Sequence, residues 1–142
     1  KYKVLAKEED GFNVYLIDHL IREGDKANKR NDFDKAKENY DKARDISKRL
    51  LSFYRDLSGS FRGLDARIPR EMDAKGRKSL EALAKANLRL AALFRQHGEP
   101  EVAVPLLVEV VRIMTPAKPY GREAYEDLLE LGFADTPYTV SR

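Results

Sequence analysis

The sequence predicts an all-α chain of about five helices, arranged as helical hairpins that stack as repeats. Apolar residues recur at helical intervals along most of the chain, and no segment keeps the alternation of a β-strand. One spacing of small and large apolar residues also occurs twice, which indicates repeat architecture. The first copy consists of Gly24, Ala27, Phe33, Ala36, Tyr40 and Ala43, and the second of Ala91, Phe94, Gly98, Ala103, Leu107 and Val110.

Length, net charge and cysteine content limit the kinds of domain and binding site that the chain can form. A chain of 142 residues is long enough for one domain with a hydrophobic core. Its formal net charge of +3, with both signs interspersed, is too small to imply an obligate polyanionic partner. The chain has no cysteine, which excludes disulfides and thiolate metal sites.

The sequence gives little information on localisation. No apolar run approaches the roughly 18 residues of a membrane-spanning helix, and no signal-peptide pattern is present. We therefore expect no membrane span. Because the chain begins at Lys1 rather than Met, it is compatible with a removed targeting segment, and the cytoplasm is only the default expectation.

The first helical hairpin is predicted to follow an N-terminal arm over residues 1–13. Apolar residues on one face predict a helix over residues 14–30. Either Asp32 or Asp34 can cap the next helix, which we expect over residues 33–57. That second helix is longer than an ordinary repeat helix.

Residues 58–78 are predicted to form a long connection. Gly59, Gly63 and Pro69 interrupt the helical pattern there. A degenerate middle repeat within residues 51–78 is the alternative. We favour the long connection because the two glycines and the proline fall where that repeat would need helix.

The second hairpin is predicted after this connection. Its first helix, over residues 79–97, is rich in Ala and Leu, which are strong helix formers. Gly98 is expected to end that helix, and Pro100 suits the first turn of the next. The following helix is predicted over residues 101–114, with Pro105 near its start, where a missing N–H costs least.

A short capping helix over residues 122–131 is expected to end the domain, followed by Gly132 and a loose tail over residues 133–142. The helix before it carries a continuous apolar stripe. If the capping helix did not cover this stripe, it would drive homodimerisation or partner docking. The stripe consists of Val102, Leu106, Val110, Ile113 and Met114.

The repeated spacing resembles the tetratricopeptide repeat (TPR) family. Counted from Ile17, the first copy matches the family pattern closely over residues 17–50. Counted from Ala84, the second copy covers residues 84–117 and resembles the kinesin light chain version, because it has Ala-x-Pro-Leu at residues 103–106. It departs from the family at Pro100, which replaces the usual aromatic residue, and at Val110, which replaces Ala. The two copies lie twice as far apart as adjacent repeats, which are about 34 residues long.

The resemblance implies an α-solenoid fragment, spanning residues 14–132, whose concave groove binds a peptide or a partner protein. It also implies an adaptor, scaffold or assembly factor. Lys85, Arg89 and Arg95 are the expected charged anchors. The groove-facing family positions are Asp18, Ile21, Asp25, Asn28 and Lys29 in the first copy, and Lys85, Leu88, Arg89, Ala92, Arg95 and Gln96 in the second.

The rival interpretation is an anion-binding module for nucleic acid or acidic lipid, built on the Arg/Lys-rich segment 62–78. Asp65, Glu71 and Asp73 interrupt that segment, so nucleic acid is not the expected partner. The basic residues of the segment are Arg62, Arg67, Arg70, Lys75, Arg77 and Lys78.

No arrangement typical of an enzyme is recognisable. His19 and His97, the two histidines, lack metal-ligand spacing. The chain has no nucleophile elbow and no glycine-rich phosphate loop. We therefore expect no catalytic activity, no cofactor and no metal.

Overall fold

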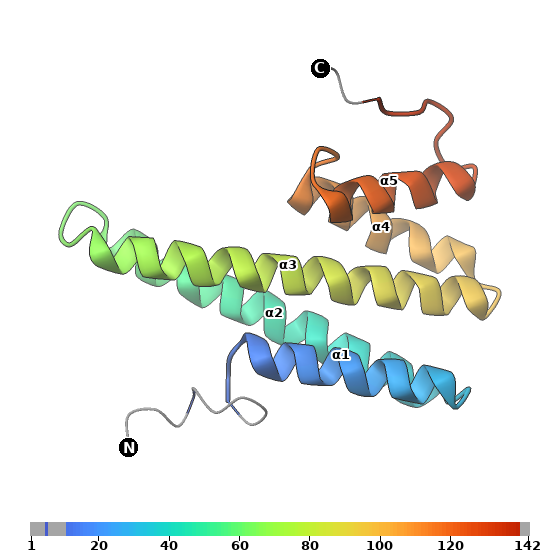
Figure 1. The fold of residues 1–142 in the computed structure, drawn as a ribbon, viewed down its shortest axis with the longest axis horizontal. Helices are drawn as coiled ribbons and strands as arrows, with labels where there is room; N and C mark the ends of the chain where they lie inside the picture. The colour runs from blue at the N-terminus through green and yellow to red at the C-terminus, as the bar shows by residue number, and fades with distance from the viewer. Residues whose placement is uncertain (1–4, 6–10, 140–142) are drawn as a thin grey trace.

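Five helices make up the part of the chain that the computed structural model describes, namely residue 5 and residues 11–139 (Figure 1). They are α1 (Val14–Lys29), α2 (Phe33–Phe61), α3 (Arg67–Gln96), α4 (Pro100–Met114) and α5 (Pro119–Glu130). This part contains no strand, so the all-α prediction is confirmed. None of its helices has both the length and the apolar composition that crossing a membrane requires.

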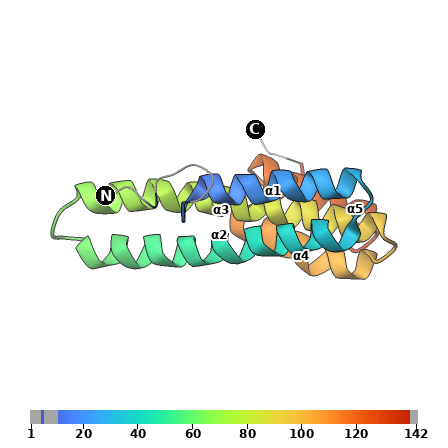
Figure 2. The same cartoon turned by 90° about the horizontal axis from the view of Figure 1, so that it is seen from below.

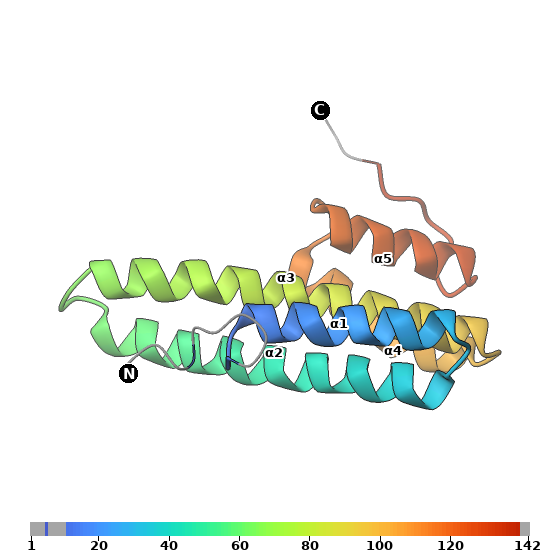
Figure 3. The same cartoon turned by 60° about the horizontal axis from the view of Figure 1, so that its bottom comes forward.

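Helix α3 lies at the centre of the arrangement. It contacts all four other helices, while α1 also packs on α2, and α4 also packs on α5. Within the described residues, the backbones of α2 and α4 do not come close, and the two helices meet only through ion pairs of Arg44 and Lys48 with Glu109. Figures 1 and 2 show the long helices α2 and α3 running side by side as an antiparallel pair, and in Figure 3 α1 lies along that pair.

The repeated spacing of small and large apolar residues marks buried positions, as predicted. Gly24 illustrates why small residues are needed, because a Cβ atom there would lie 2.5 Å from the Tyr40 ring. Helix α1 therefore approaches α2 too closely for any side chain at that position. The buried members of the two copies are Gly24, Ala27, Ala36, Tyr40 and Ala43, and then Ala91, Phe94, Ala103, Leu107 and Val110.

The helix boundaries have local causes. The Asn13 side chain accepts hydrogen bonds from two backbone N–H groups at the start of α1. Asp32, one of the two predicted caps, accepts the Lys35 N–H at 3.1 Å and begins α2. Gly98 and Gly132 follow α3 and α5 with φ of 78° and 77°, a conformation that favours glycine. Both predicted glycine stops are confirmed.

The predicted connection over residues 58–78 is wrong. Helix α2 continues to Phe61 and α3 begins at Arg67, so only residues 62–66 link them. Pro69 is the third residue of α3, where a helical N–H has no partner within the helix, so a proline is tolerated there. The alternative of a separate middle repeat is also wrong, because this part of the chain simply lengthens α2 and α3.

The lengthened helices form a hairpin that projects past the ends of α1 and α4, at the left of Figure 1. We call residues 51–80 the hairpin extension. Near its tip the two helices are joined by polar side chains. The Ser58 Oγ donates to the Asp73 carboxylate at 2.6 Å, and the Arg62 guanidinium contacts both of these residues.

The C-terminal apolar stripe is covered within the chain. Leu106, Val110 and Met114 are buried, and Val102 and Ile113 pack against the core. Helix α5, which begins slightly earlier than predicted, packs on α4. A homodimer through an exposed stripe at this place is therefore not supported.

The two ends of the chain were predicted to be loosely attached. Residues 1–4 and 6–10 of the predicted arm and residues 140–142 of the predicted tail lie outside the described residues. Next to α1, the Phe12 ring lies 6.0 Å from the Phe53 ring between centroids. In the tail, the Thr136 carbonyl accepts a hydrogen bond from the Tyr125 hydroxyl at 2.6 Å, which holds this part against α5.

Candidate binding site

A shallow cavity of about 290 Å³ lies where α1, α3 and α5 meet. We call it the α1/α3/α5 groove. Its apolar part comes from all three helices, and four charged side chains surround that part. The lining residues are Val14 and Asp18 of α1, Lys78, Glu81, Ala82 and Lys85 of α3, and Tyr120 of α5.

The four charged residues of this groove have no ion pair within the described residues. Lys78 and Lys85 lie two helical turns apart on α3, with Glu81 between them, and Asp18 belongs to α1. Because no carboxylate among the described residues forms an ion pair with the two lysines, both are available to a ligand. Asp18 and Lys85, both among the predicted groove residues, line this cavity together.

Two other predicted groove residues, Asp25 and Arg89, bind each other instead. The Arg89 Nε lies 3.2 Å from an Asp25 carboxylate oxygen, which also accepts the Tyr40 hydroxyl at 2.5 Å. Burial, followed by the bond to Asp25, raises the pKa of Tyr40, so its hydroxyl stays protonated and donates. This cluster joins α1, α2 and α3. Because Arg89 is already paired with Asp25 in the fold, its charge is not free to bind a ligand.

Arg95, the third predicted anchor, is also occupied. Its guanidinium contacts Glu130 at 3.1 Å and Asp127 at 3.7 Å, which ties the end of α3 to α5. Burial raises the pKa of Asp127, and Arg95 opposes that rise. Of the three predicted anchors, Arg89 and Arg95 are thus paired, while Lys85 has no ion pair with any residue that the structure describes.

The remaining predicted residues divide by burial. Ile21 and Leu88 lie in the core, so the prediction that they contact a ligand is corrected. The other four remain at least partly accessible but line no described cavity. These are Asn28, Lys29, Ala92 and Gln96.

Sequence reasoning did not assign Lys78, Glu81 and Tyr120 to this groove. The first two precede Lys85 by seven and four residues, the spacing that places side chains on one face of a helix. That signal was available, but residues up to 78 were interpreted as a connection. Tyr120 comes from α5, whose position no local pattern indicates.

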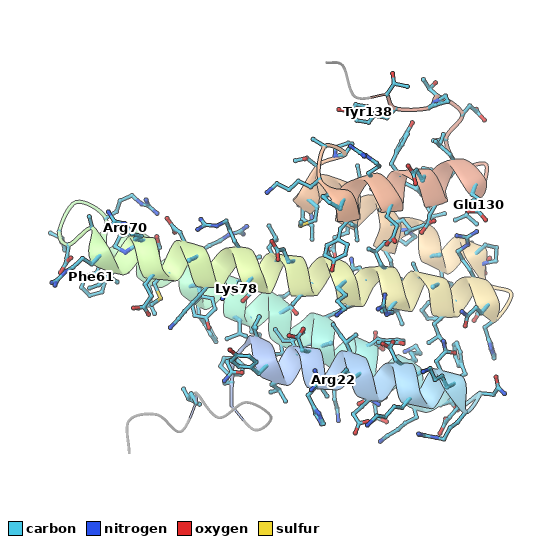
Figure 4. All side chains as sticks on the ribbon, viewed as in Figure 1. Arg22, Phe61, Arg70, Lys78, Glu130 and Tyr138 are labelled. Atoms are coloured by element: carbon cyan, nitrogen blue, oxygen red, sulfur yellow. The ribbon has the colours of Figure 1, made fainter. Side chains whose placement is uncertain are left out.

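The Arg/Lys-rich segment lies at the tip and first turns of α3. Figure 4 shows Phe61 and Arg70 at the far end of the hairpin extension, and Lys78 well behind them along α3. Three of the six cations are paired with carboxylates of the segment itself, Arg62 with Asp73, Arg67 with Asp65, and Lys75 with Glu71. The other three, Arg70, Arg77 and Lys78, have no ion pair within the described residues.

A buried polar network lies on the other side of α3. The fully buried Asn87 side chain donates to Glu109 at 2.6 Å and to the Leu106 carbonyl at 3.2 Å, and it accepts the Arg44 Nε at 2.5 Å. Burial raises the pKa of Glu109, but the Asn87 bond together with Lys48 and Arg44 holds it below its ordinary value. All polar atoms of Asn87 are satisfied, so the network joins α2, α3 and α4 structurally.

Comparisons of the chain with models of protein families, with curated proteins and with solved structures found no match. In the described part of the chain, no three His, Asp or Glu residues gather closely enough to hold a metal ion. The function is therefore inferred from the residues and geometry of this chain alone.

Proposed function

We propose that this chain is a TPR-type interaction module that binds a peptide segment of another protein in the α1/α3/α5 groove. The order of helix contacts supports this. Each hairpin packs internally, as α1 on α2 and α3 on α4, and α3 also packs on both helices of the preceding hairpin. The first helix of each pair, followed by α5, then forms one wall, which is the ligand-binding side of stacked helical repeats.

The observation that carries the proposal is the pair of unneutralised lysines in that wall. Lys78 and Lys85 stand beside Val14, Ala82 and Tyr120, so positive charge and apolar surface lie together. A peptide carboxylate can pair with the lysines while a neighbouring apolar side chain covers Tyr120. Asp18 and Glu81 favour a basic residue elsewhere in the same peptide, which fixes the orientation in which the peptide binds.

The volume of the groove agrees with a small part of a peptide rather than a large ligand. A cavity of about 290 Å³ lies at the lower limit of the roughly 300–1,000 Å³ that small-molecule sites occupy. It holds one or two side chains. We therefore propose a binding and adaptor role without chemistry of its own.

Selection from a random-peptide phage library against the immobilised chain tests this function. We expect enriched peptides to carry an acidic and an apolar residue. The variant with Lys78→Glu and Lys85→Glu should weaken their binding at least tenfold in fluorescence anisotropy. Arg122→Glu, the same kind of charge reversal at one exposed position outside every described cavity, should leave binding within twofold. Failure to enrich peptides, or equal binding by the lysine variant, would contradict the proposal.

The anion-binding module remains a second candidate because Arg70 and Arg77 have no ion pair within the described residues. Their charge at the tip would attract phosphates, and such binding weakens steeply with salt. Charge reversal at Arg67, Arg70 and Arg77 would then abolish binding to a single-stranded oligonucleotide or to phosphatidylserine vesicles. The lysine variant of the groove would leave that binding nearly intact, since it changes only Lys78 within this segment.

A further inference from the structure

A second, longer groove runs along the hairpin extension. It lies on the face of α3 that α4 covers closer to the C-terminal end of α3. It consists of two cavities, of about 370 and 220 Å³, which share Leu51, Arg55 and Leu80 and are therefore continuous. We call it the hairpin groove. Its residues come from α2, α3 and the end of α4, and none of them lines the α1/α3/α5 groove.

The floor of the hairpin groove is apolar. Leu51, Leu80, Met72 and Ile113 are partly exposed there, because α4 ends at Met114 while α2 and α3 continue. Gly76 lies between them and is itself buried. A Cβ atom at this glycine would make ordinary contacts, at 3.8 Å with Leu51 and at 3.9 Å with Tyr54, so α2 and α3 pack together beneath the groove.

The rim of the hairpin groove is positive. It carries four cations, Lys48, Arg55, Arg77 and Arg112, and three carboxylates. Two of those carboxylates are already used by the fold, since Glu109 bonds to Asn87 and Lys48, and Asp73 to Ser58 and Arg62. The third is Asp56. Arg55 and Arg77 have no ion pair within the described residues and stand on opposite helices.

We propose that the hairpin groove binds an acidic amphipathic helix of a partner protein, placed in line with α4. An apolar floor between two charged rims is the arrangement by which proteins hold an amphipathic helix. The residues of α3 that line the groove run from Met72 to Leu83, about 16 Å at 1.5 Å per residue, which accommodates three turns. The apolar face of the guest helix covers Leu51 and Leu80, and its flanking Asp or Glu residues meet Arg55 and Arg77.

The apolar floor favours a helix over nucleic acid. Phosphate binding would use the arginines but leave Leu51, Leu80 and Met72 uncovered. A guest helix instead buries the floor and satisfies the arginines together. The guest helix covers α3 in the extension in the same way as α4 covers the rest of α3.

Fluorescence anisotropy on the full chain tests the proposal with a panel of labelled 14-residue peptides. These peptides carry Leu or Ile at positions i, i+3, i+4, i+7 and i+11 and Glu or Asp elsewhere. Shuffled peptides of the same composition and peptides with Lys in place of the acids serve as controls. We expect only the acidic amphipathic peptides to bind and to gain helical circular dichroism on binding.

Two variants locate the binding. Arg55→Glu with Arg77→Glu should lower the affinity at least tenfold, while Arg122→Glu should leave it within twofold. If the doubly reversed variant has lost its helical circular dichroism, Arg55→Gln with Arg77→Gln replaces it, with at least a threefold loss expected. The lysine variant of the α1/α3/α5 groove should bind these peptides normally. A failure of this proposal can therefore be distinguished from a failure of the proposed function.

Four outcomes would overturn the proposal. They are absence of binding by every acidic amphipathic peptide, equal affinity for the shuffled peptides, and unchanged affinity in both arginine variants. The fourth is a different occupant. Tighter binding of a 15-nucleotide poly(dT) that both arginine variants abolish would assign the groove to nucleic acid. Self-association in light scattering that the same variants abolish would assign it to a second copy.

Discussion

The stacked block and the hairpin extension share the helices α2 and α3 but differ in what covers them. In the block, α1 and α4 lie against these helices, and Ala36, Ala43 and Ala84 are completely buried. In the extension, only the ends of α1 and α4 lie near the pair, and Phe53 and Leu57 are 50% and 46% exposed (Figure 2). The same helices are therefore closely packed in one half and half-covered in the other.

This difference shows how packing sets the tolerance of each half to substitution. Where a third helix approaches, side chains are limited by contact distances, and added atoms or lost hydrogen bonds are costly. Where only two helices pair, intrinsic helix propensity has more influence than fit. Changes in the block should therefore destabilise the protein, whereas matched changes in the extension should be neutral or favourable.

Gly24→Ala should give the largest loss, because the new Cβ would lie 2.5 Å from the Tyr40 ring. Tyr40 is fully buried and bonded to Asp25, so its ring has little room to move. We expect the free energy of unfolding in urea to fall by about 3 kcal/mol. A loss no larger than that of a surface substitution would show that α1 and α2 do not pack as closely as described.

Asn87→Leu should follow, with a loss of about 2 kcal/mol in the same measurement. The leucine keeps the approximate volume but leaves the Glu109 carboxylate and the Arg44 guanidinium without their shared partner. Ser60→Ala, which removes a hydroxyl bonded only within α2 in the extension, is the control and should change little. Similar losses from both substitutions would contradict the distinction between block and extension.

Glu109→Gln should cost about 1 kcal/mol at neutral pH and nothing in acid. Because the pKa of Glu109 is lowered in the folded protein, its charge stabilises the fold above the ordinary pKa of a glutamate. That stabilisation disappears as the pH falls through the folded pKa. Urea unfolding of both proteins from pH 7 to pH 3 should therefore show their difference shrinking. A difference that stays constant with pH would exclude the charge as its cause.

The helices and the buried positions could be predicted because their signals are local and repeated. Gly24 and Ala36 mark a close approach wherever two helices pair, and the repeated spacing shows that they do. Gly59 and Pro69 were misleading because their effect depends on their place in a helix. Pro69 falls in a first turn and Gly59 in a last turn, where neither breaks the helix.

The candidate site was only partly predictable, because charge pairing depends on distant segments. Asp18 and Lys85 were predicted to share a groove and do so. Arg89 and Arg95 were expected to be free, yet their carboxylate partners come from α1 and α5, and no spacing in the sequence brings these together. The charged side chains that remain unpaired can be identified only once the fold shows which of the others form ion pairs.

Gly76→Ala should give the smallest effect and the opposite sign, a gain of about 0.5–1 kcal/mol in the free energy of unfolding. Gly76 lies in the interior of α3, in the extension, and a Cβ there would make only ordinary contacts with Leu51 and Tyr54 at 3.8 and 3.9 Å. The helix therefore gains the higher propensity of alanine without a clash. Urea unfolding of both Gly76→Ala and Gly24→Ala makes the comparison direct. The substitution is the same in the two variants, and only the packing around the glycine differs. A destabilised Gly76→Ala would mean that the two helices of the extension approach as closely as those of the block.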